Sequence, residues 1–319
     1  MSLRISSTSI SLGDKGLTLV GRSRAGDGTS FVVPELKWLF DCGALVHGQE
    51  PAHIFLTHTH ADHVTFLTHY FQDEKKKPPS IYLSKEALPF IKAYIQAHRA
   101  LTELTNDIAN PIDMSCLHPV TPGEEFRIRS RGGDEYIVVP ILADHRITCY
   151  GYSFSRMKKR LKDEFADLKG HEIGQLRKQG ISIFETMREP AFCYIGDSTH
   201  RVFERNPEIL QRHKVIVTEC SFIGSKDVQR AQETQHTHWK YLKPIVESCP
   251  DTLFILIHFS LKHSALSLLE FFNEETAEHR NVHPMLVTHE MTTEWRRKKG
   301  NKGDKNAPTC QCFQCNSRV

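Results

Sequence analysis

The first forty residues alternate short apolar runs with turn residues. Apolar side chains recur in Ile5 to Leu12, in Leu17 to Val20 and in Phe31 to Val33, and segments rich in glycine and aspartate separate these runs. Short runs bounded by turn residues are typical of β-strands joined by hairpins. The pattern predicts an antiparallel meander at the start of the chain.

Farther along, brief apolar runs alternate with longer segments of helical periodicity. Ile81 to Leu83 precedes a helical pattern at 85–104, and a second helical pattern at 238–248 precedes Leu253 to Ile257. Strands that alternate with helices favour a layered α/β architecture. The segment 296–306 is rich in Lys, Arg, Gly and Asn, a composition typical of disorder. We expect one folded domain over residues 1–295, and a basic, flexible, cysteine-containing tail over 296–319.

Composition narrows the class of protein. The chain has 319 residues, 39% of them apolar, which is enough for a substantial core. Its 41 basic and 38 acidic residues nearly balance, so any nucleic-acid surface must be a local patch. No apolar run approaches the ~20 residues that span a bilayer, so we expect no membrane partner. Nine scattered cysteines do not form the framework of a small secreted domain and favour a reducing compartment.

The segment 54–63 runs from an apolar stretch directly into an H-x-H-x-D-H motif. In extended backbone, alternate side chains point the same way, so His58 and His60 can approach one ion together. After a change of direction, Asp62 and His63 can face a second ion. Imidazole and carboxylate are the ligands expected for zinc and similar divalent metals. A chance cluster in a surface loop is the alternative, and four candidate ligands in six residues behind an apolar run argue against it.

Three further apolar runs end in a candidate ligand. Residues 136–142 precede His145, residues 192–195 precede Asp197, and residues 253–257 precede His258. Taken singly, each of these would more often be a hydrogen-bonded core or loop residue. Because reactive groups gather beyond the carboxyl ends of strands in α/β sheets, their joint placement instead predicts one shared site.

Seven candidate ligands are enough for two divalent ions, most simply Zn²⁺, with Mn²⁺ or Fe²⁺ as alternatives. A water shared between two ions loses its proton near neutral pH, because a bound metal can lower the pKa of water to about 7. The ion pair also stabilises attacking and leaving oxygens, so the expected reaction is hydrolysis. One ion is assigned to His58, His60 and His145, the other to Asp62, His63 and His258, and Asp197 bridges them.

This order of ligands resembles the signature of the metallo-β-lactamase superfamily. Within it, the chain from about Gly16 to about His263 resembles ribonuclease Z, the tRNA 3′-processing endoribonuclease, and especially its short form. Three segments add to the resemblance: Gly-Tyr-Ser-Phe at 151–154, Tyr-Ile-Gly-Asp-Ser-Thr at 194–199 and Leu-Ile-His-Phe-Ser at 256–260. The resemblance implies an α/β fold, a four-layer αββα sandwich with a dinuclear metal site at the sheet edge.

Two more segments resemble the parts that distinguish this nuclease from related hydrolases. Thr-Glu-Cys-Ser-Phe at 218–222 resembles the family's His-Glu-Ala-Thr-Phe, and Gln-His-Thr-His at 235–238 resembles its Gly-His-Ser-Thr. The resemblance implies that Glu219 and His236 assist proton transfer together with Asp62. An imidazole can protonate the leaving oxygen while a carboxylate orients the ring. The alternatives are an ordinary buried ion pair for Glu219 and a helix start for His236 and His238.

The implied function is zinc-dependent removal of the 3′ trailer from precursor tRNA, by attack of a metal-activated hydroxide on a phosphodiester. The acceptor stem would be held through its phosphates and shape. Family members are commonly homodimers, so we expect a homodimer in the cytoplasm or nucleus, with an organelle as an alternative. The fold also serves other substrates, such as a small phosphodiester, a lactone or a thioester. A non-catalytic RNA-processing scaffold is a further alternative, and the complete ligand set disfavours it.

Two segments depart from the resemblance. Many ribonuclease Z proteins carry a protruding arm that grips the tRNA elbow, whereas here the matching region spans only 197 − 145 = 52 positions. We therefore expect a shortened arm. The basic run from Arg156 to Lys162 is either an abbreviated RNA contact or a solvated helix face. In the tail, Cys310, Cys312 and Cys315 either bind a structural metal with a fourth ligand or lie in a flexible segment, which we favour.

Overall fold

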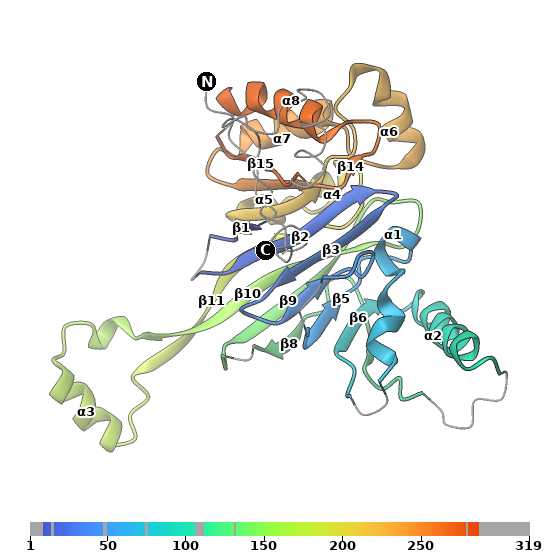
Figure 1. Ribbon diagram of the computed structural model, residues 1–319. Coiled ribbons are helices and arrows are strands. Elements are labelled where there is room, and N and C mark those ends of the chain that lie inside the picture. The colour runs from blue at the N-terminus through green and yellow to red at the C-terminus, as the bar shows by residue number, and fades with distance from the viewer. Residues whose placement is uncertain are drawn as a thin grey trace, which may run out of the picture.

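A computed structural model describes residues 9–13, 16–46, 50–73, 76–105, 112–130, 132–278 and 280–286. Two β-sheets pack face to face, and helices cover the outer side of each sheet (Figure 1). The layers therefore follow the order helix, sheet, sheet, helix, as the sequence predicted. The tail cysteines and the start of the chain lie outside the described residues.

The first sheet is built almost entirely by the N-terminal half of the chain. Its strands are, in spatial order, β1 (Ser9–Ser11), β2 (Thr18–Ala25), β3 (Gly28–Val33), β4 (Trp38–Phe40), β5 (His53–Phe55), β6 (Ser80–Ser84) and β7 (Leu117–Val120). The first four form the predicted antiparallel meander, and β4 to β7 run parallel. On the outer face lie α1 (Ala61–Val64), the 3₁₀ helix η1 (Leu67–Phe71) and α2 (Leu88–Glu103).

The second sheet comes from the C-terminal half. Its spatial order is β15 (Val282–Pro284), β13 (Leu253–Ile257), β12 (Val215–Glu219), β11 (Phe184–Tyr194), β10 (Tyr150–Leu161), β9 (Glu135–Leu142) and β8 (Phe126–Arg129). β9, β11, β12 and β13 all run in the same direction, because β10 is antiparallel to both β9 and β11, and β12 pairs in parallel with β11 and β13. Its outer face carries α4 (Arg201–Arg205), α5 (Glu208–Arg212), α7 (Trp239–Ser248) and α8 (Ala265–Glu278), and η3 (Ser225–Asp227) and α6 (Val228–Thr234) precede α7.

One short strand joins the two sheets. After β13 the chain reverses at His258, which has a left-handed φ of 64°, and enters β14 (Phe259–Ser260). β14 pairs in parallel with β2 of the first sheet. The backbone therefore crosses from one sheet to the other at His258.

Aromatic side chains fill the space between the sheets. Trp38 packs edge-on against Phe55 and Tyr136, with ring centroids 5.4 and 4.9 Å apart. Phe154 and Phe192 stack at 4.8 Å. All five side chains are at most 1% exposed, and each buried aromatic contributes on the order of 2–3 kcal/mol of hydrophobic stabilisation. The strand ends that follow are thus held by a close-packed core.

A long ribbon projects from the second sheet. The outer ends of β10 and β11, together with η2 (Asp163–Phe165) and α3 (Gly170–Lys178), form an arm of residues 156–189 that extends away from the body (Figure 1). An arm is present, and the 52 positions between His145 and Asp197 accommodate this ribbon and its helical tip. The helix interpretation of the basic run is wrong, since β10 continues to Leu161.

No helix among the described residues is both long and apolar enough to span a membrane. The six cysteines that the structure describes are all free thiols.

Candidate metal centre

The candidate ligands sit where strands of both sheets end. β5 leads through Leu56 and Thr57 to the H-x-H-x-D-H motif, while β9, β11 and β13 lead to His145, Asp197 and His258. The last three strands run in the same direction, so their carboxyl ends meet at one edge. The convergence predicted from the sequence is therefore present.

The first group of ring nitrogens is tightly gathered. His58 Nε2 lies 2.9 Å from His60 Nδ1, and His145 Nε2 lies 3.3 Å from the same atom. Asp197 Oδ2 lies 3.6 Å from His58 Nε2. Ligands about 2.0–2.1 Å from a tetrahedral ion would lie ~3.3 Å apart, so this spacing suits four ligands around one ion.

The second group shares the same carboxylate. His258 Nε2 lies 3.4 Å from His63 Nε2, 3.4 Å from Asp62 Oδ2 and 3.3 Å from Asp197 Oδ2. The Gly26 amide donates a 2.7 Å hydrogen bond to Asp62 Oδ2 and fixes that carboxylate. Asp197 Oδ2 therefore faces both groups, as the bridging assignment requires.

The protonation states suit metal binding. Burial and the neighbouring histidines lower the pKa of His58 well below its usual value and the pKa of His60 to about 4. Burial opposes ionisation of Asp62 and Asp197, yet His63 and His258 hold the pKa of both carboxyls well below the usual range. Neutral imidazoles and ionised carboxylates are the states that bind a divalent metal.

The charge balance points the same way. Three carboxylates, Asp41, Asp197 and Glu219, are between 0% and 3% exposed around this cluster. Burial lowers the pKa of His63, but Asp197 and Asp41 outweigh it and raise that pKa well above its usual value. Buried anions need compensating cations, so the donor set fits divalent metal ions and requires positive charge at the centre.

Each of four candidate ligands is oriented through its second ring nitrogen. With Nδ1 carrying the proton, Nε2 is left free to bind a metal, and such outer contacts fix the tautomer of metal-binding histidines. The Nδ1 contacts are His58 with Thr57 Oγ1 at 2.9 Å, His63 with Asp41 Oδ2 at 2.9 Å, His145 with the Gln235 carbonyl at 3.0 Å, and His258 with Ser221 Oγ at 3.1 Å.

Sequence reasoning missed Asp41. This carboxylate is fully buried, accepts hydrogen bonds from the Thr57 amide at 2.8 Å and hydroxyl at 3.0 Å, and also bonds His63. It thereby holds two segments of the ligand loop together. Asp41 directly follows the apolar strand Trp38–Phe40, so the same strand-then-ligand pattern that identified Asp197 was available for it.

Glu219 and His236 form a pair beside the centre. Glu219 is 0% exposed, and its Oε1 accepts hydrogen bonds from His236 Nδ1 at 2.7 Å and from the Ser198 amide at 2.8 Å. Burial lowers the pKa of His236, but the carboxylates of Glu219 and Asp197 outweigh it and raise that pKa to about 9. The His236 ring stacks on His258 at 5.3 Å. A charged imidazole therefore adjoins the candidate ligands.

His238 has a different environment. Its Nδ1 accepts a hydrogen bond from the Lys240 amide, and its Nε2 donates to the Gly224 carbonyl. It is the N-cap of α7. The helix-start alternative is therefore correct for His238, whereas His236 pairs with Glu219.

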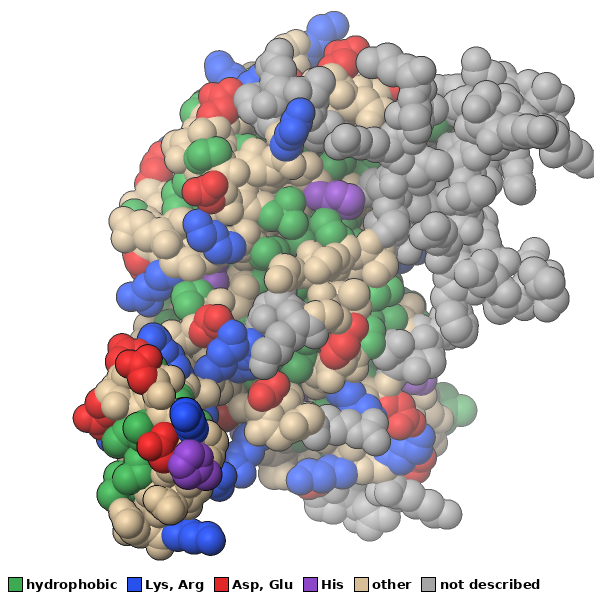
Figure 2. Space-filling model, turned by 90° about the vertical axis from the view of Figure 1, so that its left-hand side faces the viewer, with side chains coloured by type: hydrophobic (Ala, Val, Ile, Leu, Met, Phe, Trp, Pro, Cys, Tyr) green, Lys and Arg blue, Asp and Glu red, His purple; other side chains and the backbone are tan. Residues whose placement is uncertain are grey.

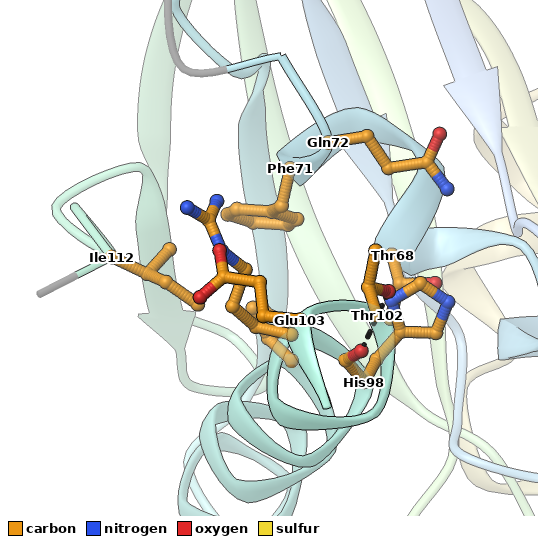
Figure 3. Close-up of a pocket in the computed structure, with 9 residues that line it drawn as sticks. Thr68, Phe71, Gln72, His98, Thr102, Glu103 and Ile112 are labelled. Atoms are coloured by element: carbon orange, nitrogen blue, oxygen red, sulfur yellow. Dashed lines mark hydrogen bonds and ion pairs between the residues drawn. The ribbon is translucent and has the colours of Figure 1, made fainter. Parts of the chain in front are cut away.

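A separate cavity lies between η1 and α2. It has a volume of about 370 Å³, and its lining includes Phe71, Gln72, His98 and Glu103 (Figure 3). None of the candidate metal ligands lines it.

No family model matches the chain. The chain is 28% identical over 257 residues to tRNase Z TRZ2, a chloroplastic protein of Arabidopsis thaliana, covering 78% of this chain and 69% of that protein. It is 29% identical over 259 residues to tRNase Z TRZ1 of the same plant, covering 78% and 88%. The chain is homologous to these two proteins named tRNase Z. The resemblance identified from the sequence is thereby confirmed.

Two solved structures are also similar. Human tRNase Z, short form, superposes with a TM-score of 0.49 at 14% identity, covering 84% of this chain and 95% of that one. A metallo-β-lactamase fold protein from Bacillus subtilis has a TM-score of 0.48 at 15% identity, covering 82% and 93%. This chain has a metallo-β-lactamase fold, with two facing sheets, helices on their outer sides and the ligand loop at the strand ends.

Proposed function

We propose that the protein is an endoribonuclease that removes the 3′ trailer from precursor tRNA. The observation that carries this proposal is the Glu219–His236 pair, which places a charged imidazole against a cluster suited to two metals. Hydrolysis of an activated ester needs no such acid. Cleavage of a phosphodiester, in contrast, releases an alkoxide leaving group that must be protonated. The similarity to proteins named tRNase Z supports RNA as the substrate.

We propose Zn²⁺ as the native ion, with Mn²⁺ or Fe²⁺ as alternatives, because the donors are mostly imidazole nitrogen. Two such ions would polarise the scissile phosphate and lower the pKa of bound water. The residues that would hold them are His58, His60 and His145 on one side, Asp62, His63 and His258 on the other, and Asp197 between.

The chain's own residues then move the proton. His236 bonds Glu219 through Nδ1, so Nε2 is the nitrogen that can donate to the leaving 3′ oxygen. Glu219 is held by the Ser198 amide and the Ser221 hydroxyl, and it both orients the ring and keeps it charged. Asp62, fixed by the Gly26 amide, has its Oδ2 3.4 Å from His258 Nε2 and would accept a proton from the attacking water.

The arm supplies a surface for RNA. Between residues 156 and 189 there are nine Lys or Arg and six Asp or Glu side chains, a net charge of 9 − 6 = +3, equal to that of the whole chain. Figure 2 faces the side from which the arm projects and shows these charges on it. A local positive excess on a projecting ribbon suits contact with the phosphates of a tRNA.

The test compares two substrates. Protein loaded with zinc or manganese is incubated with a precursor tRNA carrying a 3′ trailer and with a small chromogenic phosphodiester, with Asp62→Ala and His236→Ala as controls. Cleavage confined to the bond after the discriminator base, and absent in both variants, is expected. Turnover of the small diester alone would refute the tRNA assignment and favour a different phosphodiester.

We also propose that the protein acts in an intracellular compartment, which the relatives named chloroplastic and nuclear support. We further propose that it forms a homodimer. Phe90, Leu101 and Leu104 on α2 are 72%, 70% and 88% exposed. Phe90, Ala97 and Leu104 recur every seven residues, so an antiparallel second copy would set Phe90 against Leu104 of the partner subunit. Large apolar side chains so exposed commonly mark an interface.

Charge complementarity supports the same arrangement. Around Ala97 as the centre, Lys92 would face Thr102 of the partner subunit and lie next to the partner subunit's Glu103. Leu101→Glu should convert the dimer to a monomer in sedimentation velocity, while Lys85→Glu, just before α2, should not. A wild-type chain that sediments as a monomer at micromolar concentration would contradict the proposal.

A further inference from the structure

The arm leaves the sheet at a definite position. β9 supports β10 only as far as Arg156, which pairs with Tyr136, and β12 supports β11 only at Cys193 and Tyr194. Beyond these residues the two strands of the arm pair only with each other in the part of the chain that the structure describes. The root of the arm is therefore a two-stranded ribbon without lateral support.

The backbone ladder is weakened at this root. Phe154 pairs with Phe192 but Ser155 pairs with Pro190, so Ala191 is an extra residue and forms a β-bulge. Bulges leave a residue unpaired and bend the strand. Pro190 also has no amide hydrogen to donate to the ladder. Main-chain hydrogen bonds alone would fix the arm's direction poorly.

Ion pairs gather at the same place. Arg156 Nη2 lies 3.2 Å from Glu189 Oε2, and Lys158 bonds the same oxygen. One residue along, Arg188 bonds Glu125, which belongs to the turn between β7 and β8 of the body. The Arg156 side chain is only 2% exposed and that of Glu189 is 44% exposed, so solvent screens their ion pair less than a pair between two exposed side chains. The charges of Lys158 and Arg156 lower the pKa of Glu189.

We propose that Glu189, together with Arg156 and Lys158, sets the direction in which the arm leaves the body and so positions arm-bound RNA over the metal centre. This inference rests on the proposed function. The five residues from Met157 to Leu161 span roughly 16 Å at about 3.3 Å each, so a swing of about 10° at the root would move their far end by ~3 Å. Bound tRNA must then select the arm direction that reaches the centre, and its apparent affinity falls with the fraction of arms in that direction.

The first test measures the arm directly. In Glu189→Gln, hydrogen–deuterium exchange of amides in 157–161 and 184–189 should rise at least about tenfold, because the ribbon loses the ion pairs that tie its two strands to the buried Arg156 at the root. Glu135→Gln is the matched control, since it breaks a single exposed pair with Arg127 on the same sheet. Unchanged exchange in Glu189→Gln would overturn the proposal whether or not the protein cleaves RNA.

The second test separates positioning from general damage. Glu189→Gln should raise KM for precursor tRNA about tenfold with a small change in kcat, and leave turnover of a small chromogenic phosphodiester within twofold of wild type. Glu189→Asp, which keeps the charge, should restore much of the lost KM. An equal loss on both substrates would instead make Glu189 a structural residue. If wild type cleaves neither substrate, the proposed function fails, while the exchange result still decides the role of Glu189.

Discussion

Replacing Asp41 with asparagine should weaken metal binding without removing any ligand. In the native chain Asp41 Oδ2 accepts the proton of His63 Nδ1 at 2.9 Å, which leaves Nε2 free to face the centre. Asparagine keeps the oxygen that accepts from the Thr57 amide but presents an NH₂ group to His63. Two donors cannot pair, so His63 would shift its proton to Nε2 and lose its ligand atom. Loss of such an outer contact typically lowers metal affinity by about 10- to 100-fold, or about 1.4–2.7 kcal/mol.

The assay is competition with a chromogenic chelator at pH 7.5, with bound metal counted by mass spectrometry. Asp163→Asn is the control, because Asp163 is an exposed acid that pairs with Arg160 on the arm. Asp41→Asn should release metal at roughly tenfold lower chelator concentration and recover activity at saturating zinc. Equal metal affinity in Asp41→Asn and wild type would refute the argument that Asp41 sets the His63 tautomer.

Two further predictions concern packing and pH. Gly43→Ala would place a Cβ 1.7 Å from the Asp62 carbonyl oxygen, so the ligand loop must move. We expect the free energy of unfolding in urea to fall by about 1–3 kcal/mol and zinc binding to weaken. Gly170→Ala, with open space around it, should change neither quantity. Burial, followed by Arg212 and Arg188, lowers the pKa of His213 to about 4 from an ordinary value of 6.5. Between pH 6.5 and 4, His213 is protonated in the unfolded chain but stays neutral in the folded chain. The free energy of unfolding therefore falls as the pH is lowered through this range, by roughly 2–3 kcal/mol at pH 4.5. His213→Gln should show that much less loss between pH 7 and 4.5, and an unchanged pH profile would contradict the assigned pKa.

The sequence predicted the sheets, and the convergence of the candidate ligands, because each ligand follows an apolar run. His258 directly follows β13 and Asp197 lies three residues beyond the buried end of β11, and strand direction brings them together. Glu219 and His236 were found only through the family resemblance, since nothing in their local pattern marks a proton donor.

Other parts of the site carry no such signal. Gln235 contacts His145 through its backbone carbonyl, which every residue has, and its left-handed φ of 53° sets the geometry. The basic run in the arm stayed undecided because a ribbon exposed on both faces needs no alternation of apolar and polar residues. The run from Arg156 to Lys162 therefore could not distinguish strand from helix.

The crossing of the backbone at His258 has a consequence for how the protein is made. The ligand loop at 58–63 belongs to the first sheet and reaches its place early in synthesis, whereas His258 and the strand that pairs with β2 emerge almost 200 residues later. A nascent chain that ends before residue 258 therefore lacks both a complete ligand set and the strand that joins the two sheets. Tight metal binding would then require that both halves of the chain have been synthesised and packed together. A ribosome-bound fragment that ends near residue 250 should therefore lose zinc to a chelator that does not remove it from the full-length protein.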